Sequence, residues 1–158
     1  MDKLIRLFAG TLLVGTLLLG LALAGVPALG CSDGAPPEKT LAALGAEVGG
    51  TAQDETDFNS LLGTYATERY TSETDPELVN YQLYLTAKAS DLVLNQAEPP
   101  DTIDTEVEVD GEAATVTFTL RSRQGLFAVA DVSRIEVDLV DVGTGDLPWR
   151  IDEIRLER

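Results

Sequence analysis

The chain has 158 residues, of which 27 are acidic and 11 basic, with a single cysteine and no histidine. This acidity disfavours nucleic acid and anionic lipid headgroups as partners, because like charges repel. Without histidine or a second cysteine, the usual zinc sites, Ser-His-Asp and Cys-His catalysis and dithiol redox chemistry are excluded. Any remaining chemistry must come from carboxylate, tyrosine, lysine or arginine side chains.

The first 30 residues have the pattern of an export signal. Lys3 and Arg6 precede an uncharged, leucine-rich run from Leu7 to Ser32. A basic start followed by an apolar stretch and small residues is typical of a signal peptide that is cleaved, so this segment is not counted in the fold. From Cys31 onward the chain has 9 basic and 26 acidic residues, and its length suits one domain with a core.

The signal ends in "ALGC", residues 28–31, which resembles the lipobox of bacterial lipoproteins. Gly30 and Cys31 match that motif, whereas Ala28 stands where leucine is usual and Pro27 is an unfavoured neighbour. The resemblance implies cleavage before Cys31, lipidation of its sulfur and acylation of the new amino group. Two or more acyl chains hold a protein stably at a membrane.

Two alternatives to lipidation remain open. The apolar segment is long enough to cross a bilayer as an uncleaved anchor, since about 20 residues suffice, and plain secretion is the third option. All three place the domain outside the cytoplasm, and anchoring at the membrane, which we favour, places it in the cell envelope on the extracytoplasmic side. We therefore expect a lipoprotein signal peptide in residues 1–30, the lipidated Cys31 and a polar tether in residues 31–36, and one folded domain in residues 37–158.

Three helices are predicted in the first half of the domain. Residues 37–48 have apolar side chains at helical spacing and begin with Pro37, which suits a first turn. A second helix is predicted over residues 54–70, where apolar residues also line one face. The third begins after Asp75 and Pro76, a cap followed by a good first residue, and two prolines at 99 and 100 end the helical half.

Two hairpins are predicted in the second half, because the apolar period changes from 3.6 to 2. Residues 103–120 alternate apolar and polar side chains around an Asp110-Gly111 turn, which predicts a hairpin with one buried and one exposed face. A second hairpin is predicted from residue 133 to residue 157. Together the hairpins form an antiparallel sheet of about four strands.

Two features of this half leave alternatives. In the last strand, Ile154 and Leu156 have the opposite parity to Trp149 and Ile151, which indicates a bulge or a strand covered on both faces. Between the hairpins, residues 122–132 are too apolar for a free loop. This segment extends a strand or folds over one end of the sheet, and we favour core packing over an exposed binding surface.

Helices followed by a curved antiparallel sheet define an α+β fold. The order resembles the nuclear transport factor 2-like superfamily, also described as cystatin-like, and in particular small bacterial lipoproteins of that fold. The resemblance rests on "VDGEAATV", residues 109–116, and on Trp149, Ile151 and Ile154 of the last strand. It implies that the helices close one side of a bent sheet and leave a conical cavity. These motifs are core and turn residues, so they indicate fold more than function.

The superfamily contains enzymes as well as non-catalytic binding modules. Its enzymes use an Asp or His base with Tyr or acidic donors, and the lack of histidine excludes dehydratase-like His-Asp pairs. A Tyr/carboxylate pair could draw on Tyr65, Tyr81, Tyr84 and Asp57, although tyrosines at helical spacing more often belong to the core. We assign no catalytic residue on this basis.

No metal or cofactor is predicted. The acidic groups at residues 54–57 and 101–106 offer oxygen ligands. They lack the ordered spacing and the tight-turn glycine of a known calcium loop.

The leading hypothesis from sequence is a lipid-anchored, extracytoplasmic binding or interaction module without catalysis, whose partners are the membrane and either a small apolar ligand or a basic envelope protein. The alternative is a cone-fold enzyme of the isomerase or dehydratase type. It would transfer protons through a Tyr/carboxylate pair and would need a carboxylate of raised pKa deep in the cavity. A third hypothesis is a structural envelope component whose acidic face meets a basic partner.

Overall fold

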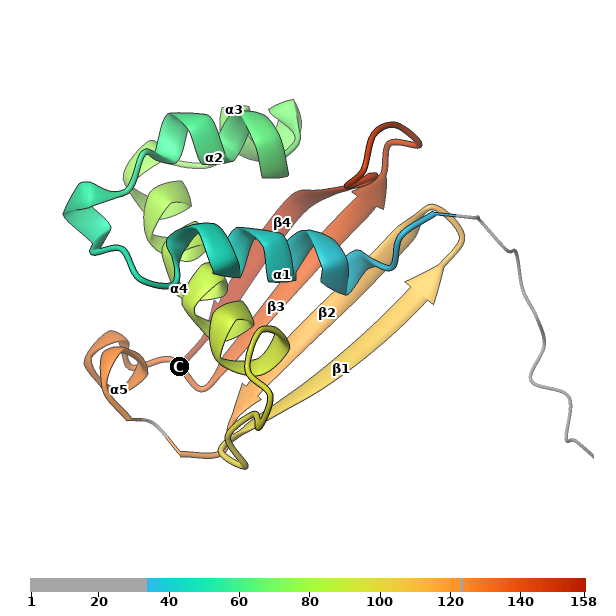
Figure 1. Ribbon diagram of the computed structural model, residues 1–158. Coiled ribbons are helices and arrows are strands. Elements are labelled where there is room, and N and C mark those ends of the chain that lie inside the picture. The colour runs from blue at the N-terminus through green and yellow to red at the C-terminus, as the bar shows by residue number, and fades with distance from the viewer. Residues whose placement is uncertain (1–33, 123) are drawn as a thin grey trace, which may run out of the picture.

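The computed structural model describes residues 34–122 and 124–158, so the predictions on the signal peptide and on Cys31 lie outside the described residues (Figure 1). The predicted α+β arrangement is confirmed: helices precede a four-stranded antiparallel sheet of order β1-β2-β3-β4. The elements are α1 (Pro37–Val48), η1 (Gln53–Glu55), α2 (Phe58–Tyr65), α3 (Glu68–Glu73), α4 (Pro76–Leu94), β1 (Ile103–Asp110), β2 (Ala113–Leu120), α5 (Leu126–Ala130), β3 (Arg134–Asp141) and β4 (Trp149–Glu157).

The first and third predicted helices are confirmed as α1 and α4. Pro37 begins α1, where its missing N–H costs nothing and its fixed φ suits the helix. Asp75 caps α4, because its side chain accepts hydrogen bonds from the backbone N–H groups of Glu77 at 3.0 Å and Leu78 at 3.3 Å. These two helices cross one face of the sheet in Figure 1.

The prediction of one helix over residues 54–70 is wrong, because the segment is divided into η1, α2 and α3. Ala66 and Thr67 have extended backbone between α2 and α3. Ala66 forms a parallel bridge with Ile151 of β4, and the Thr67 N–H donates to the Ile151 carbonyl at 2.8 Å. Pairing with a strand distant in sequence therefore interrupts the helix, and the Thr67 hydroxyl then caps α3 by accepting from the Tyr70 N–H.

Both predicted hairpins are confirmed, and of the two alternatives given for the last strand the structure has the bulge. Leu139 pairs with Ile151 and Asp138 with Glu153, which leaves Asp152 as an extra residue in β4. A bulge reverses the alternation of side chains along the strand that contains it. This explains why buried apolar residues of β4 lie three positions apart, at Ile151 and then Ile154.

The helix-facing side of the sheet is packed with apolar side chains. Five of its residues have no solvent-accessible surface at all, namely Val116, Phe118, Ile135, Val137 and Ile151. A cavity that could hold water would leave accessible surface on the residues that touch it, so none adjoins these five. The interior under the helices is therefore filled at the centre of the sheet.

A glycine lets α1 approach α4 closely. A Cβ atom added at Gly45 would lie 2.6 Å from the backbone nitrogen of Asp91 and 3.1 Å from the carbonyl oxygen of Ala87. Both obstacles are backbone atoms of α4, so they cannot move aside as a flexible side chain would. The crossing of α1 and α4 depends on the missing side chain at this position.

The segment between the hairpins folds over one end of the sheet, which was one of its two predicted forms. It contains α5, not an extension of a strand. Phe127 and Val132 are buried, as core packing predicts, whereas Val129 is 87% exposed. The Ser133 N–H donates to the Glu157 carbonyl at 2.8 Å, so α5 lies beside the C-terminal end of the chain, as Figure 1 shows.

The described chain contains its own core. The buried hydrophobic residues that form this core lie between Leu41 and Ile154, so we expect a segment of residues 34–158 to fold when expressed alone. Among the helices of the described residues, none is both long and apolar enough to cross a bilayer.

Candidate functional site

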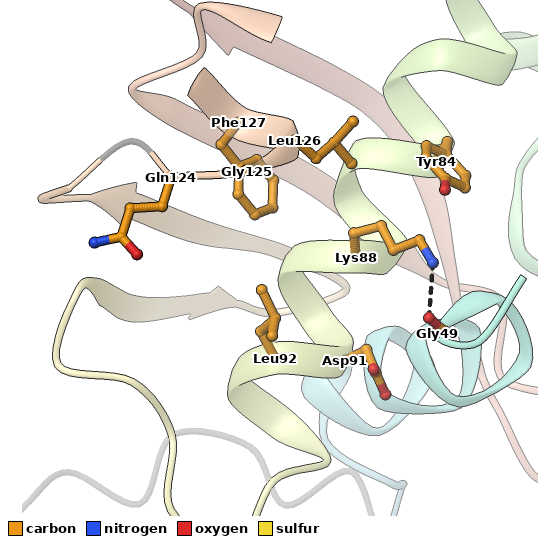
Figure 2. Close-up of a pocket in the computed structure, with 9 residues that line it drawn as sticks. All are labelled: Gly49, Tyr84, Lys88, Asp91, Leu92, Gln124, Gly125, Leu126 and Phe127. Atoms are coloured by element: carbon orange, nitrogen blue, oxygen red, sulfur yellow. Dashed lines mark hydrogen bonds between the residues drawn. The ribbon is translucent and has the colours of Figure 1, made fainter. Parts of the chain in front are cut away.

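A pocket of about 510 Å³ lies where α4, α5 and the end of α1 meet, and we call it the α4–α5 pocket (Figure 2). Its volume falls within the range of about 300–1,000 Å³ typical of small-molecule sites. The pocket is lined by Gly49, Tyr84, Lys88, Asp91, Leu92, Gln124, Gly125, Leu126 and Phe127.

The apolar side of the pocket comes from two elements that are distant in sequence. Leu92 projects from α4, and Leu126 and Phe127 belong to α5. Gly125 directly precedes α5 and has φ of +55°, a backbone conformation that residues with a Cβ rarely adopt. Gly125 therefore allows the turn that brings these apolar side chains against α4.

Lys88 is the basic group of the pocket, and it serves as a cap for α1. Its ammonium donates to the carbonyls of Val48 at 3.1 Å, Gly49 at 2.7 Å and Thr51 at 2.9 Å. The last carbonyls of a helix have no partner within the helix and carry its negative dipole end, so a cation stabilises them. An ammonium has three protons, and the three bonds use all of them.

The other polar side chains of the pocket also have partners within the protein. Asp91 accepts from the Asn95 amide at 3.2 Å, and the Tyr84 hydroxyl donates to the Thr51 carbonyl at 3.3 Å. The exposed Gln124 donates to the Ser122 hydroxyl at 3.2 Å. The pocket thus offers apolar surface to a ligand, while its polar groups are engaged in holding the fold together.

Among the described residues, Tyr65 is the one predicted tyrosine whose hydroxyl bonds a carboxylate. Its hydroxyl donates to Glu47 at 2.8 Å. Burial, followed by the hydrogen bond and charge of Glu47, raises the pKa of Tyr65 to about 12. The Tyr65 hydroxyl therefore stays protonated near neutral pH, and the Glu47 carboxylate is exposed to solvent.

The remaining candidates from the sequence do not join this pair into one site. Tyr84 lines the α4–α5 pocket, whereas Tyr81 lines a different groove together with Asp54. Asp57 caps α2 by accepting from the Ser60 N–H at 3.3 Å. Asp57 caps its own helix, whereas the hydroxyls of Tyr65 and Tyr84 bond residues of other segments, so each of the three has a structural role.

The acidic groups considered as calcium ligands do not form a metal site. In residues 34–122 and 124–158, no three His, Cys, Asp or Glu side chains gather around a point that could hold a metal ion. Asp104 of the second group instead forms an ion pair with Arg121.

Comparison with protein-family models, with curated proteins and with solved structures finds no match for the chain. The resemblance to the nuclear transport factor 2-like superfamily stays a prediction from the sequence motifs.

Most of the α4–α5 pocket was not predicted from the sequence. Its apolar side was visible as the run containing Leu126 and Phe127, which was assigned to the core. A signal for the polar side is that Lys88 is the single basic residue within Pro76–Leu94. No sequence pattern brings Lys88 of α4 and Leu126 of α5 to the same pocket, because α4 and α5 are distant in the sequence and meet only in the folded chain.

Proposed function

We propose that this protein is a lipid-anchored, extracytoplasmic module that binds a small apolar ligand in the α4–α5 pocket without catalysis. The observation that carries the proposal is the different role of the apolar and the polar side chains that line the pocket. Leu92, Leu126 and Phe127 face it, while its polar side chains are bonded within the protein. Sites of this kind hold a ligand mainly through apolar contact, with few polar groups to orient it.

Proton transfer is less well supported than binding. A general base in a cone-type enzyme needs a carboxylate shielded from water, because desolvation is what raises its pKa. Glu47 is exposed, and its tyrosine partner Tyr65 is held protonated by burial. The Tyr65–Glu47 hydrogen bond joins α1 to α2, which is a structural role.

Binding can be tested with 1-N-phenylnaphthylamine, a neutral probe whose fluorescence rises in apolar surroundings. The probe is titrated into the segment of residues 34–158, after circular dichroism has shown a cooperative unfolding transition. We expect saturable binding, and Leu92→Asp should weaken it by about tenfold or more, because a charge then lies in the apolar wall.

The matched control is Val129→Asp, which adds the same charge to a neighbouring exposed position of α5 outside the pocket. It should leave the probe affinity within about twofold. Equal weakening by both variants, or no saturable binding by the wild-type segment, would refute the pocket as the ligand site.

The anchor rests on the sequence of residues 28–31 and on Cys31 in particular. A domain with 26 acidic and 9 basic residues after Cys31 gains no attraction from anionic lipid. Acyl chains on Cys31 would hold it at the membrane in spite of that repulsion. The nuclear transport factor 2-like fold is part of the same proposal. Helices on one face of an antiparallel sheet support it, whereas the filled centre of the sheet differs from the conical cavity that the resemblance implies.

The anchor is tested by expressing Cys31→Ala and, as the matched control, Ser32→Ala in a bacterial host with radiolabelled palmitate. The Cys31→Ala chain should incorporate no label and should leave the membrane fraction, while Ser32→Ala should still be labelled. Retention of unlabelled, full-length Cys31→Ala chain in the membrane would instead show an uncleaved signal anchor.

A further inference from the structure

The free edge of β1, which we call the β1 edge, has backbone groups that find no partner among residues 34–122 and 124–158. β1 is the terminal strand of the sheet and pairs with β2 alone (Figure 1). Two bonds at the start of β1 show which residues direct their backbone groups toward β2. The Arg121 N–H donates to the Thr102 carbonyl, so Thr102 points toward the β2 side, whereas the Ile103 N–H donates to the Pro100 carbonyl and points away from β2. Because bonding alternates along antiparallel strands, Thr105, Val107 and Val109 direct their N–H and C=O groups outward.

Other elements of the described part of the chain form no hydrogen bonds with these outward groups. In residues 34–122 and 124–158, no helix, loop or side chain forms a hydrogen bond with the backbone of residues 104–110 from the outer side. β1 is regular over its eight residues, with no bulge, proline or glycine to interrupt it. Such an edge can accept another strand.

Two helix-facing side chains in the second half of β1 are apolar and exposed. Val107 and Val109 are 36% and 57% exposed. Their partners on β2, Val116 and Ala114, are buried. The apolar surface under the helices therefore continues onto β1, where the helices no longer cover it.

The opposite face of β1 is a row of carboxylates at every second position. The row consists of Asp104, Glu106, Glu108 and Asp110. One member, Asp104, pairs with Arg121. The strand next to it presents Thr115, Thr117 and Thr119 on this face, which contribute no positive charge.

A second copy of the chain is a poor occupant of this edge. Pairing β1 with another β1 would align two rows of carboxylates on the same face, and like charges on adjacent strands are destabilising. The net charge of −16 adds long-range repulsion between copies.

We propose that the β1 edge binds an extended segment of a basic partner protein by strand addition. The segment alternates apolar residues with lysine or arginine. Its backbone bonds Thr105, Val107 and Val109, its apolar side chains cover the two valines, and its basic side chains meet the carboxylate row. Neither the apolar ligand nor the α4–α5 pocket is needed for this contact.

The test uses the full chain in dodecyl maltoside micelles and a fluorescein-labelled peptide of alternating lysine and valine, matched in length to the eight residues of β1. Binding is measured by fluorescence anisotropy. A second peptide carries N-methyl groups on alternate residues, which keeps the charge and removes the backbone donors. We expect this peptide to bind about tenfold or more weakly, since several hydrogen bonds are lost together.

Charge reversal on the protein gives a second readout with a matched control. Glu108→Lys lies in the carboxylate row, whereas Glu98→Lys makes the same change at an exposed position outside the sheet. The first should weaken binding by about fivefold or more, and the second by less than about twofold.

Three results would overturn the proposal. The first is equal binding of the plain and N-methylated peptides, which would show charge attraction without strand addition. The second is no binding of the plain peptide. The third is self-association of the chain in sedimentation experiments that Val107→Lys abolishes, which would assign the edge to a second copy.

Discussion

The two edges of the sheet differ in how their outward backbone groups are satisfied. At β4, donors from three helical segments reach the strand, whereas at β1 the described chain supplies none to residues 104–110. The bonds to β4 are those from the Thr67 N–H to Ile151 at 2.8 Å, from the Gln82 amide to Ile154 at 2.8 Å and from the Thr40 hydroxyl to Trp149 at 3.3 Å.

The helices thus close one edge of the sheet and leave the other open. Each β4 contact comes from a residue close to a helix end or inside the core, so closing this edge also fixes the helices. β1 pairs with β2 alone, and its two valines, Val107 and Val109, remain exposed. We therefore expect substitutions at the β4 edge to affect stability and substitutions at the β1 edge to affect binding.

The largest effect is expected from apolar truncation. Ile151→Ala in β4 should lower the free energy of unfolding by about 2–5 kcal/mol, because a fully buried side chain leaves a cavity. Val109→Ala in β1 should lower it by less than about 0.5 kcal/mol, since the side chain is mostly exposed. Urea unfolding of the segment of residues 34–158 measures both values. Similar losses for the two variants would show that the edges do not differ.

An intermediate effect is expected at the buried amide that joins three elements. Gln82 accepts from the Tyr70 hydroxyl at 2.9 Å and donates to the Ile154 carbonyl at 2.8 Å. Gln82→Leu should lower the free energy of unfolding by about 2–3 kcal/mol, because both partners are left buried and unpaired. Adding Tyr70→Phe to Gln82→Leu should recover part of the loss, since it removes one of the unpaired groups. An additive loss, measured by the same urea unfolding, would contradict the bond between them.

The smallest effect concerns the charge at the bulge. The Arg69 guanidinium bonds the Asp152 carboxylate and holds its pKa below the usual value, with help from the Thr67 hydroxyl. A lowered pKa in the folded state adds stability above the unfolded pKa of about 3.9, and this gain disappears as the pH falls through the folded pKa. Asp152→Asn should therefore lower the free energy of unfolding by up to about 1 kcal/mol at pH 6.

The same variant should lose less relative to wild type at pH 3 than at pH 6, as measured by urea unfolding at both values. Asp101→Asn is the matched control, because Asp101 is exposed and lies outside the sheet. A difference between wild type and Asp152→Asn that does not depend on pH would argue against the ion pair.

The local elements could be predicted from sequence where their cause is local. Pro37 and the Asp75-Pro76 pair start helices through bonds and dihedral angles within one turn. The parity of Ile154, opposite to that of Ile151, indicates the bulge within a few residues of β4. In each case residues close together in the sequence determine the helix start or the bulge.

The predictions were wrong or incomplete where a contact between residues distant in sequence determines the structure. Residues 54–70 have a helical pattern, and only the bond with Ile151 explains the break at Thr67. Alternation in residues 103–120 predicted a hairpin with one buried and one exposed face, but it cannot say how far the helices extend across the sheet. Val107 and Val109 share a face with Ile103, yet they are exposed. The α4–α5 pocket was missed for the same reason, because α4 and the loop before α5 meet only in the folded chain.

Asp152, the extra residue of β4, bonds side chains at the start of α3, so the bulge and these side chains depend on each other. Without Asp152, Ile151 and Ile154 would follow regular alternation and both would still face the core, so burial alone does not require the bulge. The extra residue instead supplies the carboxylate that bonds Thr67 and Arg69. Homologous chains should therefore lose the extra residue and the arginine together, and keep both isoleucines in either case.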